Sequence, residues 1–187
     1  MKKHLAAFGL VAVLAGGLFA FEEKKPLKSG PQVNEELPGP FHPLNVNGPN
    51  AGNQFCLYCA NGSNPVAMVF ARATSPAVTK LITKIDEATN KNKDADMGSF
   101  FVFCSDEKGL SKKLEMLAKD TKISKCVLAI DEPAGPKRYN VSKEAEVTVV
   151  LYVDRTVKAN FTFRKSELKD GDIEKILAAL PTILPKK

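Results

Sequence analysis

The fold is decided by one stretch of the chain, residues 54–85, which reads QFCLYCANGSNPVAMVFARATSPAVTKLITKI. Its middle, residues 66–70, is an uninterrupted apolar run preceded by turn-forming residues, and this pattern predicts a buried strand. Ser75 and Pro76 then mark a helix start, because serine caps a first turn and proline suits the first helical position. Apolar side chains recur beyond them at helical spacing. The stretch therefore predicts a strand, a short loop and a helix, the first half of a βαβ unit.

Two cysteines, Cys56 and Cys59, stand just before the predicted strand with the spacing C-x-x-C. If residues 55–60 formed a straight strand, these two side chains would face opposite sides of the sheet and could not bond each other. In a turn or a helical corner they could meet. The pair is then either a redox-active dithiol or a structural bridge, and one of its members could also bridge to a cysteine elsewhere.

The first twenty residues have the three-part pattern of a secretory signal peptide. Lys2 and Lys3 precede an apolar run at residues 5–14, and small residues end at Ala20, where we expect cleavage. The apolar run is shorter than the roughly 20 residues of a membrane span, so we expect no stable membrane insertion after cleavage. The protein is predicted to be secreted or periplasmic, in a compartment where disulfides persist.

The charge balance argues against a nucleic-acid partner. The chain has 27 Lys and Arg against 21 Asp and Glu, and removal of Lys2 and Lys3 leaves 25 against 21, a net charge of +4. The lysines are interspersed with acids and no aromatic stripe accompanies them, which predicts a solvated surface. His42 is the histidine outside the signal peptide, and Ala60 follows Cys59, which excludes the haem-attachment motif C-x-x-C-H. We expect no metal and no cofactor.

Residues 21–53 contain six prolines and four glycines, a density at which no helix or long strand is expected. We interpret residues 21–36 as a flexible linker that adds little to stability. Residues 37–53 are predicted to form an extended arm laid on the domain by Phe41 and Leu44. A single domain is expected over residues 54–187.

The rest of the chain alternates apolar runs and amphipathic stretches. The predicted strands are residues 99–104, 126–130, 147–153 and 157–163, and the predicted helices are residues 106–121 and a last one that begins near Asp170. Strands that are apolar on both faces require cover on both faces. The last two strands are predicted to form an antiparallel hairpin at the edge of the sheet.

This order of elements resembles the thioredoxin-like fold in its peroxiredoxin-related version. PVAMVFAR at residues 65–72 resembles the first core strand of that superfamily, and YNVSKEAEVTVVLYVDRTVKANF at residues 139–161 resembles its segment of tyrosine, turn, strand, turn and strand. The resemblance implies an α/β three-layer sandwich, with a mixed central sheet and helices on both faces. It extends from residue 54 to the C-terminus.

The sequence departs from the superfamily where thioredoxins carry their chemistry. Their reactive C-x-x-C follows the first core strand, at a helix N-terminus that stabilises a thiolate. Residues 71–76 contain no cysteine here, and Val147 stands where the superfamily places a cis-proline. The polar residues of this stretch, interpreted as ordinary loop and cap residues, are Arg72, Thr74 and Ser75.

Two functions follow from these residues. The leading hypothesis is thiol-disulfide exchange with protein thiols or disulfides, with Cys56 as the more exposed nucleophile and Cys59 as its resolving partner. The rival is a redox-inactive binding domain whose cysteines stabilise the fold.

The other two cysteines, Cys104 and Cys126, are predicted to lie on parallel neighbouring strands, offset by roughly 13 Å, too far to bond each other. Cys104 is interpreted as a small buried hydrophobe, and Cys126 as a possible partner for Cys59.

Overall fold

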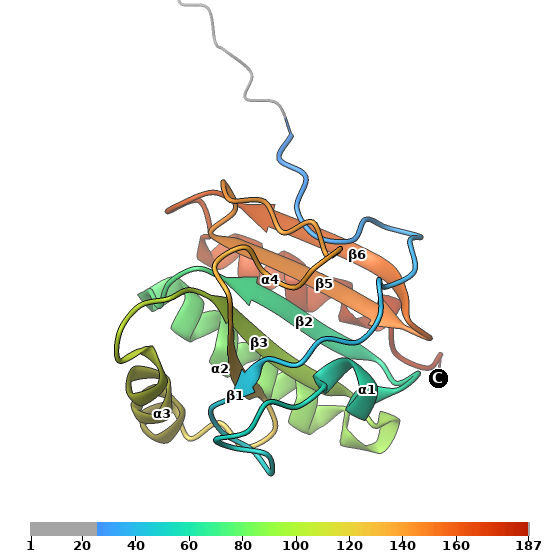
Figure 1. Cartoon of the computed structure of the whole chain (residues 1–187). Helices are drawn as coiled ribbons and strands as arrows, with labels where there is room; N and C mark the ends of the chain where they lie inside the picture. Colours follow the sequence, from blue (N-terminus) through green and yellow to red (C-terminus); the bar gives the residue numbers. More distant parts are fainter. Residues whose placement is uncertain (1–25, 187) are drawn as a thin grey trace, which may run out of the picture.

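The computed structural model describes residues 26–186, so the expected signal peptide lies outside the described residues. Within this part of the chain the strands form one six-stranded sheet in the order β1-β4-β3-β2-β5-β6 (Figure 1). The strands are β1 (Leu44–Asn45), β2 (Val66–Ala71), β3 (Gly98–Cys104), β4 (Val127–Asp131), β5 (Val147–Val153) and β6 (Thr156–Phe163). The neighbours β2, β3 and β4 are parallel, and the other pairings are antiparallel. The expected mixed sheet of an α/β fold is confirmed.

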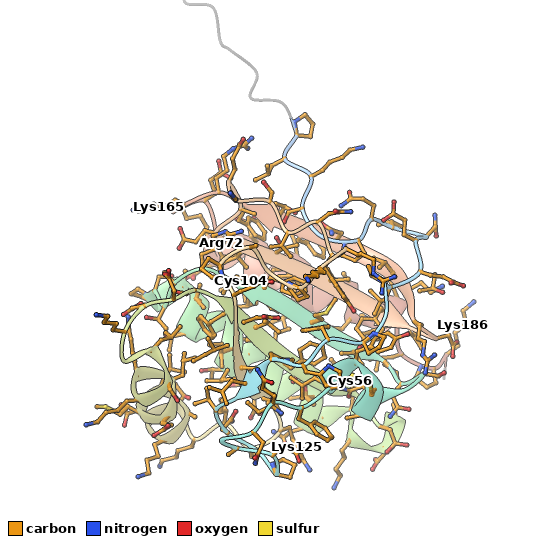
Figure 2. The ribbon with its side chains drawn as sticks, viewed as in Figure 1. Cys56, Arg72, Cys104, Lys125, Lys165 and Lys186 are labelled. Atoms are coloured by element: carbon orange, nitrogen blue, oxygen red, sulfur yellow. A yellow bond between two sulfur atoms is a disulfide. The ribbon has the colours of Figure 1, made fainter. Side chains whose placement is uncertain are left out.

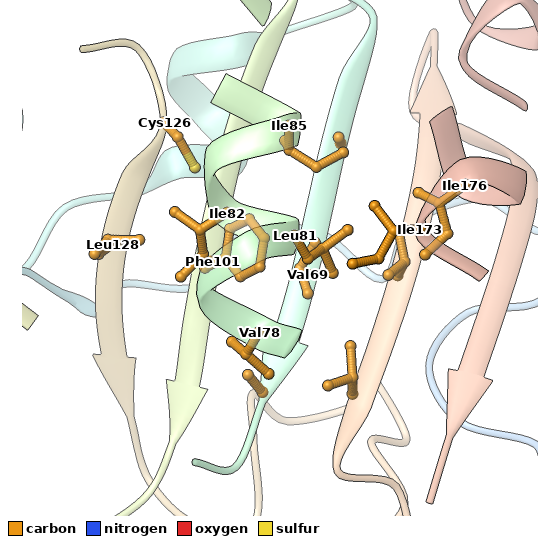
Figure 3. Packing of buried hydrophobic residues seen from close by; sticks show 14 of the residues in the cluster. Val69, Val78, Leu81, Ile82, Ile85, Phe101, Cys126, Leu128, Ile173 and Ile176 are labelled. Carbon is orange, nitrogen blue, oxygen red and sulfur yellow. The ribbon is translucent and has the colours of Figure 1, made fainter. Parts of the chain in front are cut away.

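The two faces of the sheet are covered in different ways. Helices α2 (Pro76–Lys91), α3 (Leu110–Thr121) and α4 (Asp170–Ala179) pack on one face, where Leu81, Phe101 and Ile176 belong to one apolar cluster (Figure 3). The other face carries the short helix α1 (Leu57–Asn61), the proline-rich arm and the loop before β5. Short 3₁₀ turns follow α2 and α4, at Lys93–Ala95 and Leu180–Thr182. No helix among residues 26–186 is long and apolar enough to cross a membrane.

The central strands lie where the apolar runs predict them. Strands β3, β2 and β5 are interior, and Phe101, Val149 and Leu151 are completely buried. Helix α3 begins at Leu110, four residues later than expected from residue 106. The reason is Gly109, whose φ of 82° is a left-handed conformation outside the helical region.

The arm crosses the face that the long helices leave open. The ring of Phe41 lies 4.9 Å from the ring of Tyr139 and 6.3 Å from that of Phe70, centroid to centroid. The hydroxyl of Tyr139 donates a hydrogen bond to the Gly39 carbonyl oxygen at 2.6 Å. Leu44 pairs with Ile130 of β4, so the middle of the arm forms an added edge strand, β1.

The segment 26–36, expected to be a flexible linker, is instead anchored to the hairpin of β5 and β6. Ser29 is buried, and its hydroxyl oxygen accepts hydrogen bonds from the Thr148 hydroxyl at 2.7 Å and from the Ser142 amide at 2.9 Å. The Asn160 side chain donates to the Ser29 carbonyl oxygen at 2.8 Å. Proline density excludes a helix here, but an extended chain can satisfy the polar groups of a neighbouring strand.

This anchoring predicts that the segment stabilises the fold. A chain that begins at residue 37 should lose at least about 2 kcal/mol of unfolding free energy relative to one that begins at residue 26, because the buried Thr148 hydroxyl loses its partner. Ser29→Ala should account for about 1 to 3 kcal/mol, whereas Val33→Ala at an exposed position of the same segment should stay within about 0.5. Urea denaturation measures all three. Equal stability of the two chain lengths would contradict the anchor.

Candidate functional site

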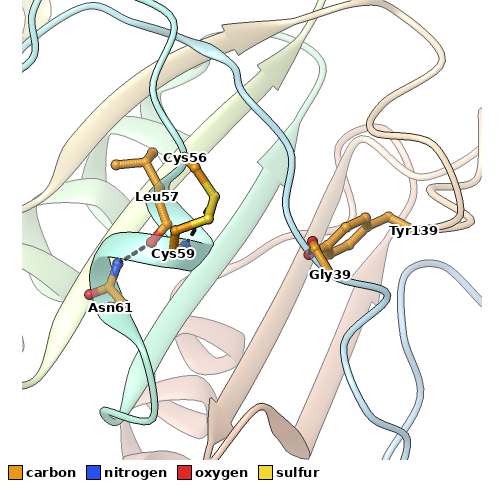
Figure 4. The surroundings of a disulfide bond; sticks show 6 residues. All are labelled: Gly39, Cys56, Leu57, Cys59, Asn61 and Tyr139. Atoms are coloured by element: carbon orange, nitrogen blue, oxygen red, sulfur yellow. Dashed lines mark hydrogen bonds between the residues drawn. A yellow bond between two sulfur atoms is a disulfide. The ribbon is translucent and has the colours of Figure 1, made fainter.

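Cys56 and Cys59 are bonded to each other, with an S–S distance of 2.06 Å and a Cα–Cα distance of 5.2 Å (Figure 4). Cys56 has an extended backbone and is the N-cap of α1, and Cys59 lies in the first turn of that helix. Because residues three apart are neighbours on a helix surface, the helical corner brings the two sulfur atoms together. The alternative of a straight strand, which would separate them, does not occur.

The two cysteines differ in exposure, in the order opposite to the prediction. Cys56 is 5% exposed and packs with Leu57 and Tyr58 in the apolar cluster beneath the arm, whereas Cys59 is exposed. The prediction that Cys56 is the more exposed nucleophile is therefore wrong. The physical reason is packing: Cys56 belongs to the apolar cluster that also contains Phe41 of the arm. Its sulfur also accepts a hydrogen bond from the Cys59 amide at 3.1 Å.

Helix α1 is short and is held by contacts with two distant elements. The Asn61 side chain donates to the Leu57 carbonyl oxygen at 2.7 Å and lies against Gly98, where an added Cβ would overlap the Asn61 Oδ1 atom. A larger residue at the start of β3 would therefore displace the Asn61 side chain. On the other side the guanidinium carbon of Arg155 lies 5.1 Å from the centre of the Tyr58 ring, a cation–π contact.

The loop after β2, where thioredoxins carry their cysteines, is tied by hydrogen bonds of Arg72 to the loop before β5. The guanidinium of Arg72 donates to three carbonyl oxygens of the loop before β5, namely those of Ala145 at 3.0 Å, Pro133 at 2.7 Å and Ser142 at 2.9 Å. Figure 2 shows Arg72 and Cys104 toward one end of the sheet and Cys56 toward the other. No local pattern predicts these bonds, because their acceptors lie 61 to 73 residues away along the chain.

The helix that follows starts as the sequence predicts. Ser75 is the N-cap of α2, and its hydroxyl oxygen accepts a hydrogen bond from the Val78 amide at 3.2 Å. This position thus holds a helix cap and no cysteine.

The remaining cysteines, Cys104 and Cys126, are free and buried. Cys104 pairs with Asp131 in the register of β3 and β4, whereas Cys126 stands just before Val127, which pairs with Phe100. The register thus offsets the two cysteines by five residues, slightly more than predicted, and neither is bonded. They also belong to the apolar clusters on opposite faces of the sheet. The suggested bridge from Cys126 to Cys59 is wrong, because Cys59 is bonded to Cys56 on the other face.

Burial keeps both free thiols protonated. Burial raises the pKa of Cys104 to about 12, against a lowering by the charge of Arg72, and burial likewise raises the pKa of Cys126 to about 12. A protonated thiol is a poor nucleophile, so neither residue suits exchange at neutral pH. Among the described residues no group of three or more His, Cys, Asp or Glu is arranged to hold a metal ion.

The raised pKa values predict a loss of stability in alkali. An unfolded thiol ionises near pH 9.0, whereas the folded thiols keep their protons to about pH 12, so their contribution is complete below pH 9 and is lost as the pH rises toward 12. Each thiol should lower the unfolding free energy by up to about 1.4 kcal/mol per pH unit in that window. Urea denaturation measures the unfolding free energy at pH 8 and at pH 10. This free energy should fall less between the two pH values for Cys104→Ala and for Cys126→Ala than for the unmodified chain. Equal losses would refute this assignment.

Comparison with solved structures identifies the fold. The structure is similar to a candidate protein disulfide isomerase from Bacteroides thetaiotaomicron, with a TM-score of 0.64 and 16% identity over 86% of this chain and 96% of the other. It is also similar to the peroxidoxin BcpB from Mycobacterium tuberculosis, with a TM-score of 0.58 and 16% identity over 86% of this chain and 100% of the other. A candidate thiol:disulfide interchange protein DsbE from Chlorobium tepidum is similar too, with a TM-score of 0.54 and 18% identity over 83% of this chain and 99% of the other.

No protein-family model and no curated relative matches the sequence. The structural likeness nevertheless agrees with the strand order and with the closing helix α4. The chain therefore has the thioredoxin-like fold, with a C-x-x-C pair that lies upstream of the first core strand instead of after it.

Proposed function

We propose that this protein carries out thiol-disulfide exchange with protein thiols through the Cys56–Cys59 disulfide. One observation carries the proposal: the bond joins an exposed residue, Cys59, to a buried one, Cys56, whose sulfur already accepts an amide hydrogen bond. This is the asymmetry that directed exchange needs, because one sulfur is reachable and the other is a held leaving group.

In the oxidising direction, a substrate thiolate attacks the sulfur of Cys59. The bond between the two cysteine sulfurs breaks, and its electron pair leaves on Cys56 as a thiolate, where the Cys59 amide at 3.1 Å stabilises the charge. A second substrate thiolate then attacks the substrate sulfur of the mixed disulfide and releases Cys59 as a thiolate. The substrate gains a disulfide and the protein becomes a dithiol, which a more oxidising disulfide partner restores.

The segment that holds the pair contributes no negative charge of its own. No charged residue occurs in the sequence between His42 and Arg72, and the fold brings the cation Arg155 against Tyr58 of α1. A nearby positive charge favours a thiolate over a thiol. The solved structures whose names include disulfide isomerase and thiol:disulfide interchange protein support the same chemistry by analogy.

A second candidate function is a binding domain in which the disulfide only holds α1 in place. The burial of Cys56 in the apolar cluster beneath the arm favours it, as does the absence of cysteine from residues 71–76.

A mixed-disulfide trap separates the two functions. With Cys56→Ser, the exposed Cys59 thiolate should attack disulfides of other proteins, release one of their sulfurs as a thiolate and accumulate as mixed-disulfide adducts. Cys59→Ser should accumulate few adducts, because the remaining sulfur is buried. The double variant Cys56→Ser with Cys59→Ser is the control and should form none through this site. Adducts that are equal in the two single variants, or absent from both, would contradict exchange at Cys59.

The reduction potential of the pair gives an independent measurement. A value of about −120 to −270 mV fits an exchanging site. A value below about −300 mV assigns the disulfide to the binding domain.

Export to an oxidising compartment is part of the proposal, supported by the pattern of the first twenty residues. Mass spectrometry of protein expressed from the full-length sequence should find a chain that begins at Phe21. Recovery of the uncleaved chain from the cytoplasm alone would refute export.

A further inference from the structure

A groove of about 880 Å³ lies on the outer side of the domain, between α3 and the loop that follows β1. Apolar side chains contribute to its lining from three segments, as Val46, Ile123 and Val127. Lysines also line it, at positions 112, 119, 122 and 125. We call this region the basic groove; it belongs to neither the disulfide nor the loop of Arg72.

The basic groove keeps a net positive charge, since four lysines line it against one glutamate. Its four lysines are exposed and form no ion pair within residues 26–186. The acid among the lining residues is Glu115, which accepts a hydrogen bond from the Ser111 hydroxyl at 3.2 Å. By contrast Lys113, on the same helix but outside this lining, is paired with Glu107 at 3.3 Å.

An exposed apolar side chain stands between two of these lysines. Met116 is 56% exposed and is a lining residue of the groove. Lys112, Met116 and Lys119 are spaced i, i+4 and i+7, so they form one stripe along the outer face of α3. A stripe with charged and apolar side chains beside an apolar lining suits an amphipathic ligand that carries negative charge.

The wall opposite α3 is fixed in place. The Asn47 side chain donates to the Cys126 carbonyl oxygen at 3.0 Å and accepts from the Leu128 amide at 2.6 Å, which ties the loop after β1 to the start of β4. A wall held by two hydrogen bonds needs little ordering when a ligand binds, so the groove is preorganised.

We propose that the basic groove binds an acidic amphipathic segment of a partner protein. Lys112 and Lys119 are roughly 10 Å apart along the helix axis at 1.5 Å per residue, so one small anion cannot reach both, whereas a segment with several carboxylates can. The lining has no aromatic residue on which a base could stack, which disfavours single-stranded nucleic acid. A concave lining suits a protruding helix or strand better than it suits a flat membrane surface.

The test is an NMR titration of the oxidised ¹⁵N-labelled protein with a synthetic peptide of Glu and Leu at amphipathic helical spacing, about four turns long. Amide shifts should be confined to α3, to residues 122–127 that follow it and to the loop after β1. The apparent Kd should rise at least about tenfold for Lys112→Glu with Lys119→Glu, and severalfold for Met116→Ser. Lys143→Glu with Lys158→Glu, an equal charge change at exposed positions outside the lining, should leave the Kd unchanged.

Three results would overturn the proposal. The first is no shift up to about 1 mM peptide. The second is equal binding of a peptide with the same composition in scrambled order, which would mean charge attraction alone. The third is tighter binding of anionic lipid vesicles or of a single-stranded oligonucleotide through the same lysines. None of these readouts depends on thiol exchange, so the two proposals can fail separately.

Discussion

The structure depends on the burial of β2 on both of its faces. Each of its six residues is at most 1% exposed, so an apolar strand must be covered from above and below. Helices α2, α3 and α4 supply one cover. The other comes from three pieces without a long helix, namely the arm, α1 and the loop before β5. The arm and this loop contact each other through Phe41 and Tyr139.

The position of the disulfide follows from the way this second cover is built. At the carboxyl end of β2, the Arg72 guanidinium occupies three carbonyl oxygens and fixes the loop before β5 against the sheet. At the amino end of β2, α1 lies at the border of the cover, with Cys56 beneath it and Cys59 facing solvent. Access is available there.

The sequence was sufficient for what depends on local patterns and insufficient for what depends on distant partners. Apolar runs located β2, β3 and β5, and Ser75 with Pro76 located the start of α2, because these signals lie within a few residues. The spacing C-x-x-C indicated a pair but not which sulfur is exposed, since the arm decides that. Proline density suggested a loose segment at residues 26–36, whereas Ser29 finds its partners more than a hundred residues away.

The size of the loop that the disulfide closes bears on its role. In the chain-entropy model a bridge across four residues stabilises a fold by roughly 2 kcal/mol, compared with about 4.7 for a hundred-residue loop. The bond links Cys56 only to its own helical turn, and α1 has other anchors in Asn61 against Gly98 and in Tyr58 against Arg155. Opening the bond therefore gives up less stabilisation than opening a long-range bridge would, and the other contacts of α1 remain. The exchange proposed for this pair requires an opening of this kind, in which the bond breaks while the domain stays folded.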